Sequence, residues 1–460
     1  MTFQTNFPLY STKLPYITVS ARGMSNGLSD IPNDGADFGP DTLLGTSSKG
    51  QYGPPYTQTS GIQEAVNYMF TQYQIFPNQN TTVPIIKLSN GNFIVKTGIQ
   101  INIPSSPPNG FGIYGVDQMS TYIDVETNDD LFKINNPNSN GIQITIANFQ
   151  STVIPGYNPN SLFNWRDPQL TNQTLVVQHV NGSNGGWVNG TLYLQNLANV
   201  ILFDHERYGT GVNISNVTLY TDIAGTNDLV VIGELNNGAA ALSNLTNINE
   251  VLIDGAWIGW YNLNGCGAVK IRGNGFAGLA LSGNNNTIDI DASGNYILTG
   301  PYSSTSFTPI VIYNNSGTSI TVDNFRMKLY YWWRQSPIEF WNGNISFNNI
   351  EIELHAILNT TIPNFTLPTQ STTSGTTAGT VNIISTKYTK SYKKYLIQFS
   401  GYENDTTTNQ TINYPLPFST SAVITGNNTG LTVSTTTSGI TITAPNSTAT
   451  YSGIVIVEGY

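Results

Sequence analysis

The sequence predicts an all-β protein, and three observations support this prediction. Charged residues make up only 10% of the 460 residues, against about a quarter in typical globular domains. Gly contributes 44 residues, and Asn, Thr and Ser supply most of the polarity. Thr favours pleated strands, whereas Gly and Asn favour turns. Short segments of alternating apolar residues recur between turn residues, which is the pattern of half-buried strands.

The segment 60–73 is the one stretch with a clear helical pattern. Its apolar residues recur at helical spacing: Ile62, Val66, Met69 and Phe70. Ser60 and Gln63 match a capping box at the start of the helix. We therefore expect one helix near the N-terminus, followed almost entirely by strands.

Strand signals follow the helix directly. In "IIKLSNGNFIVKTGIQINI" (85–103), apolar residues alternate on either side of the turn "SNGN". The next segments, "GFGIYGVDQMSTYIDV" and "DLFKI", continue the pattern. Ahead of the helix, "NDGADFGPDT" places Asp34, Asp37 and Asp41 around a glycine turn.

This order of segments, from "NDGADFGPDT" through "GIQEAV" and the strands to "GIYGVDQMSTYIDV", resembles the opening module of the pectate-lyase superfamily. The superfamily comprises right-handed, single-stranded parallel β-helices of polysaccharide-active enzymes and viral tailspikes. The resemblance implies that the helix caps the open end of a β-helix, and that Asp34, Asp37 and Asp41 belong to a structural turn. It is specific over residues 30–125.

Beyond this module the prediction rests on periodicity. Short strands with inward aliphatic residues recur at spacings of about 18 to 35 residues, which fits the rungs of a repeat fold. Two segments align position by position: Phe325, Met327 and Leu329 with Ile350, Ile352 and Leu354. Asn-rich turns such as "NNN" (284–286) are suited to stacked amide ladders at bends.

The pattern changes near Thr361 to a stretch rich in Pro, Ser, Thr and Gly, typical of a linker. After it, segments from "KKYLIQFSGY" to "GIVIVEGY" predict about six antiparallel strands in a small β-sandwich. This unit resembles the C-terminal tip domains of viral fibres and of archaeal virus proteins. The predicted organisation has four parts: an N-terminal arm (1–25), a right-handed parallel β-helix (26–362), a linker (363–380) and a C-terminal β-sandwich (381–460).

The charge balance and the apolar segments bear on the class of partner. A formal net charge of -10 argues against nucleic-acid binding, which needs a basic face. No apolar run approaches the ~20 residues of a membrane span, and the N-terminus lacks the pattern of a secretory signal. The single Cys266 excludes an intrachain disulfide framework. Neither a zinc nor a calcium spacing occurs, so we expect no metal and no cofactor.

Glycosylation sequons recur along the chain, either by chance in an Asn- and Thr-rich sequence or because the protein is extracellular. They include Asn172, Asn189, Asn213, Asn216, Asn244, Asn344, Asn364, Asn404 and Asn409. An extracellular protein without a signal peptide can be a virion component that is released by lysis. We therefore expect the protein on a virion surface or outside the cell.

Paired carboxylates are the first candidates for chemistry. Asp289 and Asp291 alternate with aliphatic residues, so both should project outward from one strand, about 7 Å apart at their backbones. Glu351 and Glu353 repeat this arrangement. Glycoside hydrolysis requires two carboxyl groups at such separations. The alternative is that these charges only solvate the strands.

The segment "FDHERYGTG" concentrates further ionisable groups: Asp204, His205, Glu206 and Arg207. Asp204 and Glu206 could supply an acid or a base next to an arginine that binds carboxylates. The alternative is a salt-bridged loop. The sequence patterns of the superfamily's polygalacturonases do not appear in order, so no specific motif supports an enzyme.

Aromatic clusters are the candidates for glycan contact, and two are prominent: Tyr330, Tyr331, Trp332, Trp333, Arg334 and Trp341 in one, and Trp257 and Trp260 in the other. Consecutive aromatic residues on a strand cannot all face one core, because strand side chains alternate. Exposed Trp and Tyr rings suit stacking on sugars, and they equally suit packing against a neighbouring subunit.

The sequence thus predicts a viral attachment protein that binds host surface polysaccharide or glycoprotein glycans. We expect a homotrimer that also contacts other virion proteins. One alternative is a polysaccharide lyase or glycoside hydrolase that uses outward carboxylates. The other is a structural protein of a virion or cell surface with no ligand.

Overall fold

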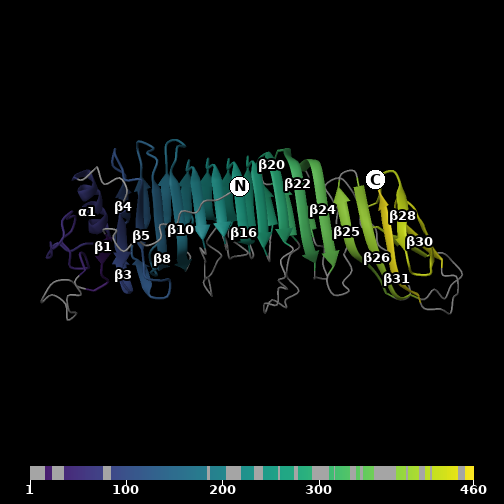
Figure 1. Ribbon diagram of the computed structural model, residues 1–460, viewed down its shortest axis with the longest axis horizontal. Helices are drawn as coiled ribbons and strands as arrows, with labels where there is room; N and C mark the ends of the chain where they lie inside the picture. Colours follow the sequence, from purple (N-terminus) through teal and green to yellow (C-terminus); the bar gives the residue numbers. More distant parts are fainter. Residues whose placement is uncertain are drawn as a thin grey trace. The chain divides into compact units, whose positions relative to one another are not determined.

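The computed structural model (Figure 1) describes residues 16–22, 36–75, 84–183, 187–203, 219–232, 242–256, 260–273, 278–292, 310–314, 316, 318–331, 338–341, 345–356, 380–389, 392–402, 410–414, 417–443 and 451–460. The chain divides into two compact units, Met1–Ile253 (unit 1) and Asp254–Tyr460 (unit 2). The described residues form an all-β protein with long parallel sheets, smaller antiparallel sheets and one α-helix. None of their helical residues make a segment long and apolar enough to span a membrane.

Helix α1 (Ile62–Ile75) begins two residues later than the sequence predicts. The predicted apolar face is confirmed, since all its residues are buried: Ile62, Val66, Met69 and Phe70. The predicted capping box is wrong, because Thr59 Oγ1 accepts the N–H of Gln63 at 3.0 Å. Ser60, with φ of 51°, bonds strand β3 (Gly91–Val95) instead. Its hydroxyl donates to Ile94 O at 3.0 Å and accepts from Ile94 N at 2.9 Å.

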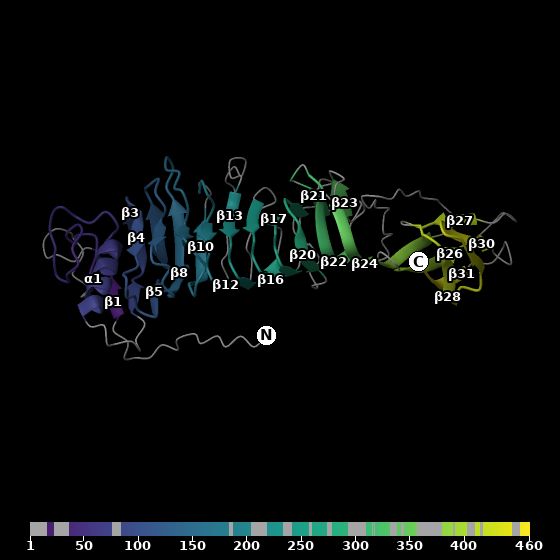
Figure 2. The same cartoon turned by 90° about the horizontal axis from the view of Figure 1, so that it is seen from above.

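The start of α1 also bonds strand β4 (Ile99–Asn102). Gln63 Nε2 donates to Gln100 O at 3.0 Å, and Gln63 Oε1 accepts from Gln100 N at 2.6 Å. Strand β4 lies at the end of its sheet, where backbone groups need a partner in place of a further strand. The amide of Gln63 supplies that partner, so α1 caps this end of unit 1 (Figures 1 and 2).

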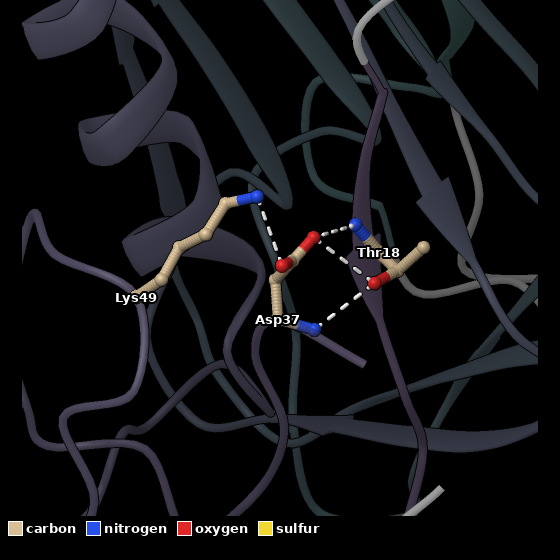
Figure 3. Close-up of polar contacts among 3 residues, drawn as sticks. All are labelled: Thr18, Asp37 and Lys49. Atoms are coloured by element: carbon tan, nitrogen blue, oxygen red, sulfur yellow. Dashed lines mark hydrogen bonds and ion pairs between the residues drawn. The ribbon is translucent and has the colours of Figure 1, made fainter. Parts of the chain in front are cut away.

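The acidic turn ahead of α1 is tied to the first strand, β1 (Tyr16–Val19). Asp37 Oδ2 accepts from Thr18 N at 2.9 Å and from Thr18 Oγ1 at 3.1 Å, and Asp37 Oδ1 pairs with Lys49 Nζ at 2.9 Å (Figure 3). Asp41 is buried, and Asp34 lies outside the described residues. The contacts of Asp37 match the structural role that the sequence predicts for this turn. Strand β1 falls within the predicted arm (1–25) and pairs with β2 (Ile85–Leu88).

Unit 1 holds two long parallel sheets. The first runs in the order β1, β2, β5 (Gly110–Tyr114), β8 (Gln143–Val153), β10 (Thr174–Ser183), β12 (Asn199–Phe203) and β14 (Asp228–Ile232). The second runs in the order β4, β7 (Phe132–Asn135), β9 (Phe163–Arg166), β11 (Leu192–Gln195), β13 (Leu219–Ala224) and β15 (Leu242–Thr246). From β7 onward, consecutive strands alternate between the sheets, and β12 and β13 lie on opposite sides of unit 1 (Figure 2). This arrangement is compatible with the predicted parallel β-helix.

The long strand β8 bends at Asn148, whose φ is 64°. The residues before Asn148 pair with β5, and those after it pair with β6 (Thr121–Val125), which in turn pairs with β3. His179, with φ of 48°, occupies the corresponding position in β10. Asparagine tolerates this left-handed backbone better than most residues. The bends therefore turn β8 and β10 from one face of unit 1 to the next.

The core of unit 1 consists of stacked columns of inward side chains. Residues on neighbouring strands stand opposite one another in register and are fully buried, as in the column Ile146, Val177, Leu202 and Val231. The rings of Phe132 and Phe163 stack with centroids 5.5 Å apart and planes 16° apart. Burial of apolar area is the main stabilising contribution here, at about 25 cal/mol per Å².

Unit 2 also holds two parallel sets of strands. One set runs β18 (Ala268–Gly273), β20 (Asn285–Ala292), β22 (Ile320–Tyr331) and β24 (Ile345–Ala356). The other runs β17 (Trp260–Asn264), β19 (Gly278–Leu281), β21 (Ile310–Asn314) and β23 (Ile338–Trp341). Strand β16 (Glu250–Ala256) spans the point where the units divide. The predicted repeat is confirmed, since Phe325, Met327 and Leu329 pair with Ile350, Ile352 and Leu354.

The C-terminal strands are antiparallel. Strand β25 (Thr380–Thr389) pairs antiparallel with β24, and the sheet continues through β26 (Tyr392–Tyr402) and β31 (Tyr451–Gly459) to β28 (Ala422–Asn427). A second sheet contains β27 (Gln410–Asn413), β30 (Gly439–Thr443) and β29 (Thr432–Thr435). Tyr395 and Tyr414 stack at 4.8 Å in the buried core of this part. Of the predicted linker (363–380), only Thr380 is among the described residues. Independent folding of residues 381–460 stays a prediction.

Candidate functional site

For many of the functional residues that the sequence predicts, the structure describes no side chain. Asp204, Glu206, Trp257, Trp332, Trp333 and Arg334 are outside the described residues. For four more only the backbone is described: Trp260 in β17, Tyr330 and Tyr331 in β22, and Trp341 in β23. The role of these aromatic clusters in glycan contact therefore stays a prediction. The candidate site described below consists of other residues.

Asp289 and Asp291 lie on β20 with the orientation that the sequence predicts. Ile288 and Ile290 are buried in the core, and the two aspartates between and after them are half-buried on the outer face. The parallel register sets Asp289 opposite a cation on each neighbouring strand, and Asp291 likewise. These opposed pairs are Lys270 and Arg326 for Asp289, and Arg272 and Lys328 for Asp291.

The next strand, β24, extends the alternation of charge. Glu351 stands opposite Arg326, and Glu353 stands opposite Lys328 with their charged atoms 3.9 Å apart. Opposite charges on adjacent strands attract, whereas like charges would repel. The outward charges of β18, β20, β22 and β24 thus alternate in sign, and we call this surface the charge lattice. The alternation favours the second of the two predicted roles for these carboxylates, in which they solvate the strands. The catalytic assignment of Asp289 and Asp291 stays a prediction.

A different outer face, in unit 1, gathers planar polar groups. On β9, β11 and β13 the inward residues are buried: Phe163, Trp165, Leu192, Leu194 and Ile223. The outward residues that alternate with them form what we call the Arg–Tyr face: Asn164, Arg166, Tyr193, Gln195 and Asp222. Neighbouring parallel strands are about 4.8 Å apart, so these groups stand close enough to contact one ligand together.

The centre of the Arg–Tyr face is a stacked pair. The guanidinium carbon of Arg166 lies 4.2 Å from the ring centroid of Tyr193, and one guanidinium nitrogen of Arg166 donates to Gln195 Oε1. Arg166 is exposed and Tyr193 is half-buried. An arginine held in this way presents its remaining N–H donors in a fixed plane. The pair therefore offers an apolar ring beside oriented hydrogen-bond donors.

Asp222 lies beside this pair, opposite Tyr193 on the next strand. Burial raises the pKa of Asp222, and this effect exceeds the lowering by the Arg166 guanidinium. Asn164, on the other side of Tyr193, donates to Asp130 Oδ2 at 2.8 Å. The face therefore combines a carboxyl group, a side-chain amide, a phenol and a guanidinium on three successive strands.

A ladder of amides continues the Arg–Tyr face toward β7 and β4. Asn135 Nδ2 donates to Asn102 Oδ1 at 2.7 Å and to Gln100 Oε1 at 3.3 Å. Lys133, which is exposed, stands between Gln100 and Asn164 in the register. The Asn-rich turns of the sequence predict amide ladders at bends, whereas this ladder runs along strand positions.

Arg166, Tyr193 and Asp222 are not among the candidate residues that the sequence predicts. A signal was present, because "FNWR", "LYLQ" and "YTDIA" each alternate apolar residues with these polar ones. This alternation does not show which segments are neighbours in the sheet. In the part of the chain that the structure describes, no cluster of three or more His, Cys, Asp or Glu residues could hold a metal ion. No protein-family model, curated protein or solved structure matches the chain.

Proposed function

We propose that this chain is a viral attachment protein of the tailspike or fibre type, built on a right-handed parallel β-helix, that binds host surface glycans. The Arg–Tyr face is the surface on which we place the ligand. The observation that carries the proposal is the stack of Arg166 on Tyr193, which Asp222 and Asn164 flank on adjacent strands.

The chemistry of the face suits a sugar. A sugar ring presents C–H groups on its faces and hydroxyl groups at its rim, so it needs an aromatic or otherwise apolar surface beside donors and acceptors. Tyr193 supplies the aromatic surface, Arg166 and Asn164 supply donors, and Asp222 and Gln195 supply acceptors. An open sheet face offers no deep pocket, so affinity has to come from several such contacts.

A homotrimer and contacts with other virion proteins belong to the same proposal. Strands β12 and β14 read "NVILF" and "DLVVI", almost continuous apolar runs, which are typical of strands covered on both faces. Val200, Leu202, Leu229 and Val231 face the core, and Ile201, Val230 and Ile232 face outward. Ile232 is 45% exposed. A second copy of the chain would cover this outward apolar stripe.

The second candidate function is cleavage of the glycan rather than binding alone. The observation that favours it is the position of the Asp222 carboxyl group opposite Tyr193. Burial also raises the pKa of Asp222, and a raised pKa increases the protonated fraction of a carboxyl group, which is the form that acts as a general acid. In this version Asp222 protonates the leaving oxygen of a glycosidic bond, a water molecule adds to the anomeric carbon as that bond breaks, and the proton of the water passes to solvent. The Arg–Tyr face holds one carboxyl group and so supplies the acid but not the second carboxylate that most glycosidases use.

Incubation of the full chain with immobilised cell-surface polysaccharides tests the proposal and separates the two functions. Retention of the protein without release of reducing ends supports attachment. Release of reducing ends that is lost in Asp222→Asn supports cleavage. A protein that neither binds nor cleaves any of the polysaccharides contradicts both, and favours the purely structural alternative.

A further inference from the structure

The glycosylation sequons in the described residues differ in the exposure and the hydrogen bonding of their asparagines. They are Asn172, Asn181, Asn189, Asn244, Asn285, Asn314 and Asn427. N-glycosylation requires that the asparagine amide and the hydroxyl residue two positions later enter an enzyme active site together. The folded chain can therefore carry a glycan only where both groups are accessible and the backbone has room.

Burial excludes three of these asparagines as glycan acceptors. Asn181, Asn285 and Asn314 have exposed fractions of only 5%, 3% and 4%. Asn285 also uses its side chain to support the backbone, since its Oδ1 accepts from Cys266 N at 2.9 Å. A bulky polar glycan at any of these positions would have to leave the interior, and the fold would open.

Three more asparagines are excluded as acceptors by local hydrogen bonds, by burial of the hydroxyl residue or by strand pairing. Asn427 Oδ1 accepts from Thr429 N at 3.0 Å and from Thr429 Oγ1 at 2.6 Å, while Asn427 Nδ2 donates to Leu431 O at 3.0 Å. The hydroxyl residue of the Asn189 sequon, Thr191, is 1% exposed. Asn244 lies within β15, paired with Asp222 on the adjacent strand.

Asn172 differs from all of these. It ends a run of five exposed residues, 168–172, in the loop between β9 and β10. Leu170 in the same run is 40% exposed. The hydroxyl residue Thr174 is half-buried at the first position of β10, where the strand begins between Gln143 and Asn199. Its Oγ1 accepts from Asn199 Nδ2 at 3.1 Å, a bond that does not use the hydroxyl hydrogen of Thr174 and does not involve the amide of Asn172.

We infer that Asn172 is an N-glycosylation acceptor, and that the other sequons of the described residues are not acceptors in the folded protein. The donor is an oligosaccharide linked to a lipid through pyrophosphate. In the transfer, the side-chain nitrogen of Asn172 loses a proton and forms a bond to C1 of the first sugar. The bond from C1 to the pyrophosphate oxygen breaks, and the lipid pyrophosphate leaves. This inference does not depend on the ligand proposed for the Arg–Tyr face.

The test is an in vitro transfer reaction on the folded full chain. A single-subunit oligosaccharyltransferase and a lipid-pyrophosphate-linked oligosaccharide are added, and peptide mass spectrometry measures occupancy at each sequon. A synthetic peptide that spans residues 168–176 confirms that the enzyme accepts this sequence. We expect occupancy at Asn172 to be several-fold higher than at Asn181, Asn189, Asn244, Asn285, Asn314 or Asn427.

Two variants make the result specific. Asn172→Gln should remove the modification of this loop, and Asn189→Gln should leave the occupancy of Asn172 unchanged. The inference is overturned if the peptide is modified while Asn172 in the folded chain is not, or if Asn172 is occupied no more than the buried Asn285.

Discussion

The side-chain amide of Gln63 in α1 forms two hydrogen bonds with the backbone of Gln100 in β4, one as donor at 3.0 Å and one as acceptor at 2.6 Å. This is the pattern in which a neighbouring strand would bond β4. It shows how a helix can help to close the end of a parallel sheet, because one side chain bonds the N–H and C=O of a residue in the end strand.

Replacement of Gln63 should therefore weaken the fold. Gln63→Ala removes both bonds, together with the bond from Gln63 Nε2 to Asn67 Oδ1 at 3.0 Å, and leaves the N–H and C=O of Gln100 without this partner, so the free energy of unfolding should fall by about 1 to 3 kcal/mol. Urea unfolding followed by circular dichroism measures the change. Gln58→Ala is the matched control, since the side chain of Gln58 bonds the nearby Tyr56 O among the described residues. Equal stability of the Gln63 variant and the control variant would contradict the capping role.

The charge lattice of unit 2 predicts a salt-dependent effect at Asp289. Asp289→Lys sets three cations side by side, at positions 270, 289 and 326, whereas Asp289→Asn only removes the attractions to Lys270 and Arg326. We expect the lysine variant to be less stable than the asparagine variant by up to about 1 kcal/mol at low salt. The gap should narrow near 1 M salt, where the screening length is about 3 Å. A gap that is absent at low salt would show that the lattice contributes nothing to stability.

The pKa of Asp222 predicts how stability depends on pH. Burial raises this pKa in the folded protein, so the folded chain binds the proton more tightly than the unfolded chain, and ionised Asp222 lowers stability. The cost is absent below the unfolded pKa of about 3.9, and it reaches its full size above the folded pKa. Asp222→Asn should therefore be more stable than wild type at neutral pH, and the two should converge near pH 3. A variant that is destabilised equally at both pH values would contradict this assignment.

The outward apolar stripe on β12 and β14 predicts the oligomeric state. We expect light scattering to give the mass of a trimer for the wild type and a smaller mass for Ile232→Lys, with unchanged circular dichroism. Val188→Lys is the matched control, because Val188 is 58% exposed in a loop between strands and should not affect assembly. A monomeric wild type would overturn the trimer.

Much of this fold follows from local patterns in the sequence. The period of the helix identified the buried face of α1, and the alternation around Asp289 and Asp291 identified their outward orientation. The capping box was wrong because Thr59 and Ser60 are adjacent and both are suitable caps, and only the position of β3 decides between them. A strand pattern does not reveal which residue stands opposite, because register depends on the length of every intervening loop. For that reason neither the cations beside Asp289 nor the Arg–Tyr face could be predicted.

The most direct test of the proposed attachment function compares two tyrosines that each have a cation over the ring. Arg166 lies 4.2 Å from the ring of Tyr193 on the Arg–Tyr face, and Lys87 lies 4.0 Å from the ring of Tyr16 outside it. The ligand is the polysaccharide that gives the strongest signal for wild type on an array of cell-surface polysaccharides, and calorimetry measures its Kd. We expect Tyr193→Ala to weaken binding by about 1 to 3 kcal/mol, while Tyr16→Ala binds as wild type does and both variants stay folded. Unchanged binding by Tyr193→Ala would contradict glycan attachment through the Arg–Tyr face.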